Sequence, residues 1–309
     1  MIDASTMRGS AMKIMAEIEG MLDRPFRIIA TAFCFAVFGL GGVLILCFVF
    51  PCLRFFYADL QVSQQHARRI IHRSFKWFVR LMEVCGVISH EVRQAEKLAR
   101  TGLLIVANHP SLIDVVLLIA LIERPNCVIK ASLRDNVFTR GPVRSAGFVV
   151  NTDGPQLVAD CVASVRSGDN LIIFPEGTRS LTHNGALNPL KRGAANIALR
   201  GGLPLTPVVI TVSEPMLGKG QSWRDAPRKR PHFILGVEDD LPVTPYCAAL
   251  AEEKLMSDDA ADGGAAAGEA LSAASRMARR LSRDLSAFFA EKITRQGADA
   301  MSADGLPRQ

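Results

Sequence analysis

The apolar run at residues 28–50 constrains this chain most, because its 23 positions (IIATAFCFAVFGLGGVLILCFVF) contain no charged residue. Thr31 is the only polar side chain within it. A helix needs about 20 apolar residues to cross the hydrocarbon core of a bilayer. Arg24 and Arg27 precede the run and Arg54 follows it. We therefore expect residues 28–50 to anchor the chain to a membrane.

Two arrangements of this anchor are compatible with the sequence. A single span is simpler and is favoured, but the GLGG cluster at residues 39–42 also permits a re-entrant hairpin of two short helices. Lysine and arginine number four in residues 1–27, the flanking segment, and six in residues 51–80. Because basic residues concentrate on the cytoplasmic side of membranes, this bias predicts a cytoplasmic (inner) membrane protein whose main domain faces the cytoplasm.

The overall composition narrows the class of partners. Hydrophobic residues make up 49% of the chain, the mean hydropathy is +0.20, the net charge is +6 and the pI is about 9.1. A basic balance suits nucleic acid, an anionic membrane face or phosphorylated substrates. Aromatic residues reach only 6% and no zinc-finger spacing occurs, so no nucleic-acid partner is expected. The seven cysteines form no C-x-x-C pair, which predicts a reduced, cytosol-facing protein without a disulfide framework or a metal site.

Residues 64–82 (QQHARRIIHRSFKWFVRLM) carry a second membrane signal within an interfacial region at residues 51–99. At helical spacing, one face of this segment is apolar and basic residues lie off that face. The apolar residues are Ile71, Phe75, Phe78 and Met82, and the basic ones are Arg69, Arg73, Lys76 and Arg80. A basic amphipathic helix suits the lipid headgroup region, whereas a surface helix packed on the domain shows the same pattern. Both interpretations stay open, and both can hold at once.

From about residue 100 the chain alternates short apolar runs with helical stretches. Strands are predicted at residues 103–107, 127–130, 147–150, 171–174, 207–212 and 232–237, and helices at residues 115–122, 156–167 and 192–201. Apolar strands that alternate with helices indicate a sheet buried on both faces. We therefore expect an α/β fold at residues 100–250, with a mixed, mostly parallel central sheet and helices on both faces.

The C-terminal region, residues 251–309, reads as a linker followed by one helix. The segment SDDAADGGAAAG at residues 257–268 has the composition of a flexible linker. Apolar residues then recur every three or four positions from Leu271 to Phe288, which predicts an amphipathic helix. Packing on the domain, pairing with another copy and lying on lipid all remain open for this helix.

The stretch NHPSLIDVV at residues 108–116 places polar residues between two apolar segments. Ser111 and Asp114 have the spacing of a capping box at the start of a helix. His109 has no such explanation, because it follows a strand, and ligands of open α/β sheets bind at the carboxyl ends of strands. Asp114 can hold one ring nitrogen of His109 protonated and leave the other free to take a proton. The pair therefore predicts a general base and its orienting carboxylate, without a serine nucleophile.

A second polar segment, LIIFPEGTRS at residues 171–180, follows another predicted strand. Pro175 lacks the N–H that a central strand needs, so the strand should end there. The next side chains would then project from the same edge as His109, with Glu176 holding a hydroxyl and Arg179 holding an anion such as phosphate. An ordinary turn closed by a Glu–Arg ion pair is the alternative.

Together, N-H-x4-D and F-P-E-G-T-R resemble the 1-acylglycerol-3-phosphate acyltransferase family, the lysophospholipid acyltransferases. Two further blocks of the family have similar residues here: Lys130, Leu133, Gly141, Pro142 and Gly147 for the second, and GLPLTPV at residues 202–208 for the fourth. The four blocks follow the family order over roughly residues 100–240. The apolar anchor also agrees with the resemblance, because such enzymes sit on membranes to meet their lipids.

The resemblance implies a membrane-bound O-acyltransferase that moves a fatty acyl group from acyl-CoA or acyl carrier protein to a lysophospholipid hydroxyl. With 1-acyl-sn-glycerol-3-phosphate as acceptor, the product would be phosphatidic acid. His109 would deprotonate the hydroxyl, which attacks the thioester without an acyl-enzyme, and Asp114 would orient His109. The substrate-binding residues implied are Glu176, Gly177, Thr178 and Arg179, with Lys130 and Arg144 as further contacts for anions. No cofactor and no metal are implied, and the expected partners are membrane lipids and the acyl donor.

One segment departs from the family pattern. After Gly147 the family carries an acidic–basic pair whose basic member helps to bind phosphate, but Asn151 and Thr152 stand here. Arg144 or Arg134 would have to supply that charge, or the acceptor is a lysolipid with another head group or a specialised lipid. A catalytically silent lipid-binding membrane protein is the alternative of another class, although all the motif side chains are present.

Two basic groups outside the motifs also have open interpretations. Lys191 and Arg192 either help to hold an anion or begin a helix on the surface. A second cluster either faces a phosphate-rich membrane or an acidic carrier protein, or is a solvated loop. Its members are Arg224, Arg228, Lys229 and Arg230.

Overall fold

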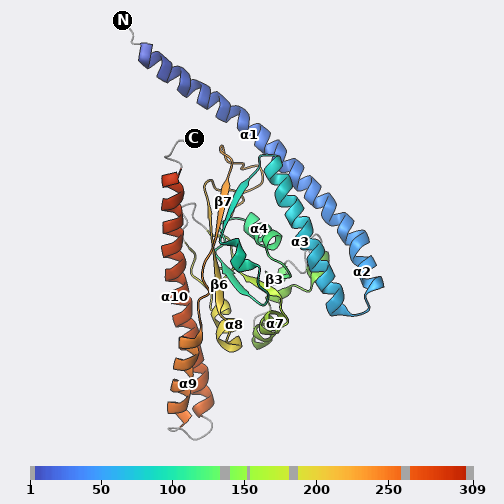
Figure 1. Cartoon of the computed structure of the whole chain (residues 1–309), viewed down its shortest axis with the longest axis vertical. Coiled ribbons are helices and arrows are strands. Elements are labelled where there is room, and N and C mark those ends of the chain that lie inside the picture. Colours follow the sequence, from blue (N-terminus) through green and yellow to red (C-terminus); the bar gives the residue numbers. More distant parts are fainter. Residues whose placement is uncertain (1–3, 133–139, 152–153, 181–186, 259–264, 304–309) are drawn as a thin grey trace.

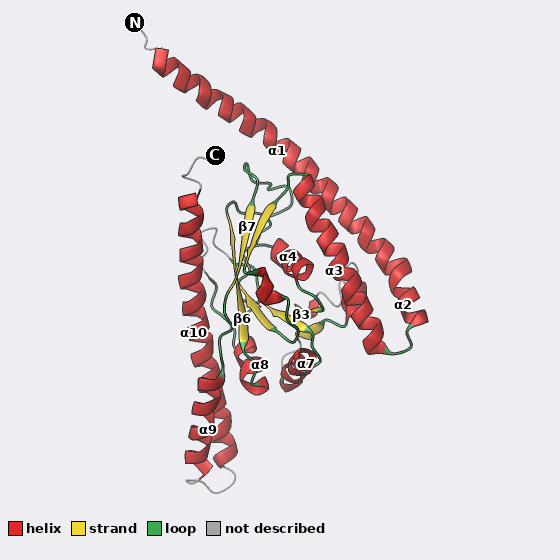
Figure 2. Ribbon diagram, viewed as in Figure 1, coloured by secondary structure: helices red, strands yellow, loops and turns green. Residues whose placement is uncertain are grey.

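A seven-stranded sheet forms the centre of the computed structural model, which describes residues 4–132, 140–151, 154–180, 187–258 and 265–303 (Figures 1 and 2). The strands are β1 (Ser89–Arg93), β2 (Leu104–Ala107), β3 (Pro125–Lys130), β4 (Val149–Asn151), β5 (Asn170–Ile173), β6 (Leu205–Val212) and β7 (His232–Val237). Their order across the sheet is β1-β7-β6-β2-β5-β3-β4. Neighbouring strands run parallel except β6 and β7, which are antiparallel. The expected mixed, mostly parallel sheet is therefore confirmed.

Helices cover both faces of this sheet, as expected (Figure 2). They are α1 (Ala4–Leu44), α2 (Phe50–Phe56), α3 (Leu60–Val84), α4 (Ile113–Leu121), α6 (Arg140–Ala146), α7 (Pro155–Arg166), α8 (Gly193–Gly201), α9 (Thr244–Asp258) and α10 (Ala265–Ala303). Successive residues of a strand face opposite sides of its sheet. In β2, Ile105 and Ala107 join a core with α3 and α4, whereas Leu104 and Val106 join a core with α7, α8 and α10. Two separate apolar cores thus hold the sheet.

The sequence pattern does not predict β1, α6 or α9. β1 has the polar sequence SHEVR and pairs only with β7 at the edge of the sheet, so it lacks an apolar run. α6 contains Gly141 and Pro142, a pair that usually marks a turn. Because β1 starts at Ser89, the sheet begins before the domain boundary predicted at residue 100. α9 extends to Asp258 and α10 begins at Ala265, so of the predicted linker only residues 259–264 lie outside the described residues.

The N-terminal helix runs without a break through the glycine cluster at residues 39–42. α1 passes into a π-helical turn at Ile45–Val49 and then into α2. Within the described residues, one helical stretch, Arg24–Phe56, is long and apolar enough to cross a membrane, judged by length and composition alone. The chain does not reverse at the glycines, so this structure lacks a hairpin of two short helices there.

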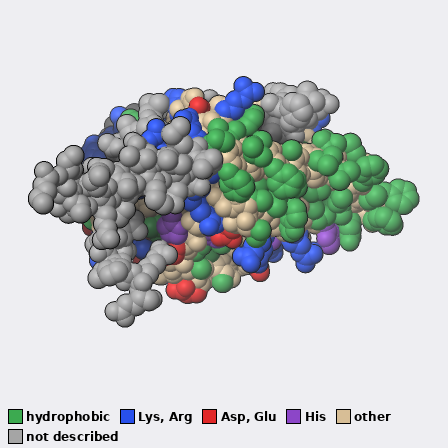
Figure 3. Space-filling model, turned by 90° about the horizontal axis from the view of Figure 1, so that it is seen from above, with side chains coloured by type: hydrophobic (Ala, Val, Ile, Leu, Met, Phe, Trp, Pro, Cys, Tyr) green, Lys and Arg blue, Asp and Glu red, His purple; other side chains and the backbone are tan. Residues whose placement is uncertain are grey.

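One face of this helix packs on α3, and the opposite face is exposed. Ala30 and Cys34 are buried, and the ring centre of Phe38 lies 4.5 Å from that of Phe78 in α3. The exposed face carries a stripe of large apolar side chains: Phe26, Ile29, Phe33, Leu40, Leu44, Phe48 and Phe55. Figure 3 shows hydrophobic side chains gathered over this part of the molecule. Apolar patches of this extent on proteins usually mark contact with another molecule or with a membrane.

The amphipathic segment predicted at residues 64–82 lies within α3, and its apolar face packs on the domain. Ile71, Phe78 and Met82 are buried in the core that α3 shares with α4. The basic side chains off that face are exposed: Arg69, Arg73, Lys76 and Arg80. Packing on the domain is thus realised, and the basic face of α3 stays open to its surroundings.

Two glycines of the second block seat the N-terminal helices on the domain. A Cβ atom on Gly141 would overlap the side chain of Leu46, and a Cβ atom on Gly147 would overlap that of Gln64 in α3. Gly147 also has a φ of +61°, a backbone conformation that residues other than glycine rarely adopt. These glycines are therefore required by the close approach of the helices to α6 and its following turn.

A buried ion pair ties α3 to the sheet. Arg68 donates from Nη1 to the carboxylate of Asp169, which directly precedes β5, and from Nε to the carbonyl of Ala146 at 2.7 Å. The two charged side chains are only 9% and 7% exposed. Asp169 also accepts from Arg124 at 3.3 Å and from the hydroxyl of Ser164 at 3.2 Å. The carboxylate is thus the centre of a hydrogen-bonded network beneath α3.

The C-terminal helix packs on the domain, which is one of the three possibilities that the sequence leaves open. Its buried residues are Ala278, Leu281, Leu285, Phe289 and Ile293. Farther along, Gln296 is also buried, and its Nε2 donates to the carbonyl of Ile234 at 2.8 Å and to the hydroxyl of Thr211 at 3.0 Å. α10 thereby covers one face of β6 and β7 and joins the two strands.

Candidate active site

His109 and Asp114 form a hydrogen-bonded pair at the carboxyl end of β2. Nδ1 of His109 lies 3.0 Å from Oδ2 of Asp114, and the two side chains are 13% and 0% exposed. A carboxylate at this distance holds the proton on Nδ1. Among the described residues, Nε2 of His109 has no hydrogen-bond partner, so this nitrogen is available to take a proton from a substrate.

Asp114 combines the two roles that its position in the sequence allows. Oδ2 accepts from the backbone N–H of Ser111 at 2.7 Å as well as from His109, so the same oxygen closes the start of α4 and orients the imidazole. Oδ1 is buried and has no partner in the part of the chain that the structure describes. Burial raises the pKa of Asp114 above its ordinary value, and the hydrogen bonds from His109 and Ser111 partly oppose that rise.

Three residues from the segment that follows β5 fix His109 in place. The ring of Phe174 stacks on the imidazole, with ring centres 4.2 Å apart and planes 29° apart. The backbone N–H of His109 donates to Oε1 of Glu176 at 2.8 Å, and the carbonyl of His109 accepts from Ser180 N at 2.8 Å. The two polar segments of the sequence are therefore joined directly, and the prediction that both lie at one edge of the sheet agrees with this geometry.

Glu176 organises this loop rather than facing a substrate hydroxyl. It is buried, with 2% exposure. Besides His109, its carboxylate accepts from the hydroxyl of Ser180 at 2.8 Å, from Asn188 N at 3.0 Å and from Asn188 Nδ2 at 2.8 Å. The alternative, a turn closed by a Glu176–Arg179 ion pair, is not realised either, because Arg179 donates to backbone carbonyls. Glu176 is a positioning residue that holds the backbone of His109.

Replacing Glu176 with glutamine should lower both stability and turnover. The new amide would point N–H groups at donors, and leaving a buried polar group unpaired costs about 1–3 kcal/mol. We expect a lower thermal unfolding midpoint and slower turnover of substrate, measured on the protein in the same detergent. Glu91→Gln is the matched control, because Glu91 is exposed and, among the described residues, pairs only with Arg93 and His232. Equal midpoints for the two variants would contradict the role of Glu176.

Arg179 is held by the loop that follows β6. Its Nη1 donates to the carbonyl of Leu217 at 2.7 Å and to that of Gly218 at 2.9 Å. Nε and Nη2 have no hydrogen-bond partner among the described residues. A guanidinium with two free donors on one edge is suited to a phosphate or carboxylate.

A second cation, Lys191, crosses the loop that carries Arg179. A Cβ atom on Gly177 would come within 2.9 Å of Nζ and Cε of Lys191, and Gly177 has a φ of +65°. Only glycine thus allows the Lys191 side chain to cross this loop. No carboxylate of the described residues lies within ion-pair distance of Lys191. The sequence leaves the role of Lys191 open, and in the structure its Nζ lies beside Gly177, in the loop that also carries Arg179.

Two further residues fix the backbone of the site and were not predicted as site residues. Asn108 is buried, and its side chain both donates to and accepts from the backbone of Ile210 at 2.7 Å, which fixes the end of β2 against β6. Leu217 is buried with a φ of +52°, a strained conformation for a leucine. Its carbonyl accepts from Leu112 N as well as from Arg179. The Asn of N-H-x4-D was the available signal for the first; Leu217 offered none.

The remaining predicted residues lie at or near the same edge without contacting His109. Lys130 ends β3 and is exposed, Arg144 is exposed on α6, and Thr178 is partly buried in the Arg179 loop. Among the described residues, none of these side chains has a hydrogen bond or ion pair with the His109 group. Asn151 ends β4 and is exposed. Leu133, Arg134 and Thr152 lie outside the described residues.

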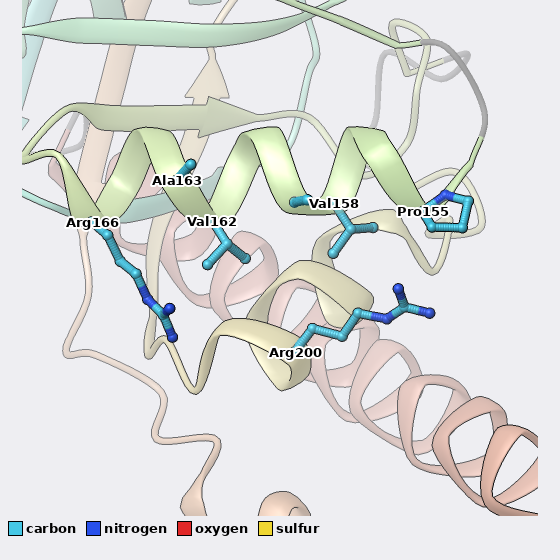
Figure 4. A pocket seen from close by; sticks show the side chains of 7 residues that line it. Pro155, Val158, Val162, Ala163, Arg166 and Arg200 are labelled. Carbon is cyan, nitrogen blue, oxygen red and sulfur yellow. The ribbon is translucent and has the colours of Figure 1, made fainter. Parts of the chain in front are cut away.

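A groove of about 430 Å³ lies elsewhere, between α7 and α8 (Figure 4). Val158 and Val162 line it together with Arg166 and Arg200. It contains no residue of the His109 group and no predicted site residue. The described residues also contain no cluster of three metal-ligating side chains.

Comparison with known proteins finds a matching family model and similar curated proteins. Residues 89–211 match the family model described as Acyltransferase. A 1-acyl-sn-glycerol-3-phosphate acyltransferase of Cocos nucifera is 32% identical over 138 residues, which cover 42% of this chain and 42% of that protein. One of Saccharomyces cerevisiae is 30% identical over 159 residues, 48% of this chain and 51% of that protein. The chain thus aligns with about half the length of these curated relatives.

A solved structure has the same overall architecture. The crystal structure of the 1-acyl-sn-glycerophosphate acyltransferase PlsC from Thermotoga maritima matches with a TM-score of 0.55 and 19% identity, covering 77% of this chain and 99% of that chain. Similarity at this level of identity concerns the fold alone. It confirms the fold class expected from the sequence.

Proposed function

Because residues 89–211 match the family model described as Acyltransferase, we propose that the protein transfers a fatty acyl group from a thioester donor to the free hydroxyl of a lysophospholipid. The preferred acceptor is 1-acyl-sn-glycerol-3-phosphate, and the product is phosphatidic acid. The observation that carries the proposal is the His109–Asp114 pair with a free Nε2, beside an arginine with unused donors.

The reaction needs one base and no covalent enzyme intermediate. Nε2 of His109 takes the proton of the acceptor hydroxyl as its oxygen attacks the thioester carbonyl. The tetrahedral intermediate then collapses, the C–S bond breaks, and His109 returns its proton to the leaving thiolate. The imidazolium formed on the way is stabilised by the carboxylate of Asp114, which stays ionised while His109 is charged.

The anion site supports a phosphorylated acceptor. Arg179 and Lys191 bring two cations to the loop after β5, although Asn151 stands where the family carries part of a charged pair. Lys191 thereby offers a charge that the β4 end lacks. A lysolipid with another head group remains the alternative acceptor, because the exposed Asn151 brings no charge to this edge of the sheet.

The location follows from the apolar helix. We propose that Arg24–Phe56 attaches the protein to the inner membrane with the catalytic domain facing the cytoplasm, where acyl-CoA or acyl carrier protein is available. The uncharged stretch and its exposed apolar stripe support this arrangement. The acyl donor binds without any resident cofactor in this proposal.

A panel of acceptors tests the proposed function. Membranes that contain the protein are given labelled acyl-CoA or labelled acyl carrier protein, together with lysophosphatidic acid or lysolipids with other head groups. Label in phosphatidic acid, absent with His109→Ala, supports the proposal. Label only in another lysolipid would support the same acyl-transfer chemistry with a different acceptor. Absence of transfer to every acceptor from both donors would overturn it in favour of a lipid-binding protein.

Replacing Arg179 should separate acceptor binding from donor binding. Loss of a charged hydrogen bond costs about 1.5–3 kcal/mol, so Arg179→Gln should raise the KM for lysophosphatidic acid roughly 10- to 100-fold and leave the KM for the acyl donor nearly unchanged. Glutamine ends two bonds short of Nη1, so the thermal unfolding midpoint of the variant controls for loss of the contact with Leu217. Equal changes in both constants would remove the phosphate role from Arg179.

A further inference from the structure

The connection between β6 and β7, residues 213–231, is a structured loop at the edge of the sheet that carries the candidate active site. Two successive turns shape it. Gln221 N donates to the carbonyl of Gly218 at 3.2 Å in the first turn, and Asp225 N donates to the carbonyl of Ser222 at 3.0 Å in the second. Buried residues on either side, such as Met216 and Ala226, fix the loop to the domain. The residues at its tips therefore have defined positions.

The tips of these turns carry basic side chains, and the second tip also carries an aromatic ring. Lys219 lies in the first turn, and Trp223 and Arg224 lie in the second. The guanidinium of Arg224 is 5.1 Å from the centre of the Trp223 ring, and Trp223 is 39% exposed. Arg228 and Lys229 are exposed farther along the loop. No carboxylate in the described ranges lies within ion-pair distance of these four cations, so their charge is not neutralised within the fold.

Hydrogen bonds place this loop beside the start of the apolar stripe on α1. Arg230 donates from Nη2 to the carbonyl of Glu83 at 2.9 Å, near the end of α3. Arg27 of α1 donates to the carbonyl of Gly86 at 3.2 Å, in the turn that follows α3. Phe26, next to Arg27, is 62% exposed and begins the stripe. The basic loop and the apolar stripe thus meet at one corner of the molecule, where the loop lies near α1 and the end of α3 (Figure 1).

We propose that the loop at residues 213–231 docks on the headgroups of an anionic bilayer. The basic side chains bind the lipid phosphates, and Trp223 lies at the interface between the headgroups and the acyl chains, where indole rings are favoured. An acidic protein partner would account for the charges but not for the apolar stripe that begins beside them. The combination of the two surfaces fits a bilayer.

Docking would also bear on the candidate active site. The base of the loop accepts the hydrogen bonds of Arg179 through Leu217 and Gly218. A loop held on the headgroups thereby holds Arg179 at the surface from which a phosphorylated lipid enters. This second step rests on the proposed function, whereas docking of the loop does not.

The two tryptophans of the chain, Trp77 and Trp223, allow a direct test. Trp77→Phe leaves Trp223 as the single fluorophore in the full-length protein. Its quenching is measured in vesicles with lipids brominated near the headgroup or near the chain end, made of phosphatidylcholine with or without phosphatidylglycerol. We expect the strongest quenching by shallow bromines, more quenching with phosphatidylglycerol, and less at high salt.

A charge variant tests whether the basic side chains hold the loop. Arg224→Gln, Arg228→Gln and Lys229→Gln together should weaken loop docking by about fivefold for each charge removed. The matched control carries Arg200→Gln, Arg283→Gln and Arg295→Gln, three exposed residues on α8 and α10. The control should quench like the parent.

Several outcomes would overturn the proposal. One is that brominated lipids do not quench Trp223 at either bromine depth, although the protein floats with the vesicles. Another is a charge variant that quenches as strongly as the control. Protection of Trp223 from acrylamide by acyl carrier protein, with no quenching by brominated lipids, would assign the loop to an acidic protein instead. None of these readouts requires acyl transfer, so their failure is distinct from failure of the proposed function.

Discussion

Replacing His109 with alanine is expected to reduce acyl transfer by roughly 10²- to 10⁴-fold, the usual contribution of a positioned general base. The reason is that Nε2 is the free basic atom of the pair, while Nδ1 is engaged by Asp114 at 3.0 Å. The loss should appear mainly in kcat, because the proton is moved in the transition state. Initial rates with labelled donor and a saturating acceptor measure it.

Two controls separate this loss from damage to the fold. The alanine variant should keep its thermal unfolding midpoint close to that of the parent, since the side chain of His109 is only partly buried and the loop is held through its backbone. Asp114→Asn should also slow transfer strongly, because an amide can favour the wrong tautomer of the imidazole. Transfer by His109→Ala at the parental rate would remove the general base from the mechanism.

Replacing Asp169 with asparagine is expected to destabilise the protein by about 3–5 kcal/mol, which is the usual result when one partner of a buried ion pair is removed. Arg68 would keep its charge in a nearly dry site without the carboxylate that balances it. Arg124 and Ser164 donate to different oxygens of Asp169, and asparagine keeps only one oxygen, so one of these two donors would lose its acceptor as well. Thermal or denaturant unfolding in one detergent measures the change.

The matched control is Asp239→Asn. Asp239 pairs with Lys97, but its side chain is 94% exposed, and exposed pairs contribute little to stability. This variant should unfold like the parent. If Asp169→Asn also unfolds like the parent, α3 is held by its apolar face alone and the ion pair has no structural importance.

The central strands and the general-base pair could be predicted because their signals are local. Apolar runs marked β2, β5 and β6, and a histidine five residues before an aspartate can meet it only if a helix starts between them. The end of β5 could also be predicted, because Pro175 interrupts an otherwise continuous apolar run. Residues at the ends of parallel strands then share one edge of the sheet.

The partners of those side chains could not be predicted, because they come from distant segments without a periodic pattern. Glu176 accepts from Asn188, which sits in a polar stretch that gives no strand or helix signal. The carbonyl that binds Arg179 belongs to Leu217, whose positive φ has no counterpart in the sequence. Burial of Arg68 likewise contradicts the usual exposure of arginine, and only the position of Asp169 explains it.

The ambiguity of α3 has a similar physical cause. A basic amphipathic helix has the same spacing whether its apolar face meets lipid or protein. In this structure Ile71 and Met82 face α4 and the sheet, so the deciding information lies in the partner surface. β1 was not predicted because its sequence contains no apolar run. An edge strand pairs on one side only and needs few apolar residues.

The path of the chain through the sheet sets the order in which a newly made molecule can fold. β1 pairs with β7, so Ser89 must wait for His232 to leave the ribosome, and the covering helix α10 emerges later still. The apolar α1 precedes all of them. During synthesis the membrane-seeking helix is thus exposed long before its seat on Gly141 exists. In the proposed membrane arrangement, a bilayer is available to this helix before the folded domain is, and the domain then folds on a chain attached to the membrane.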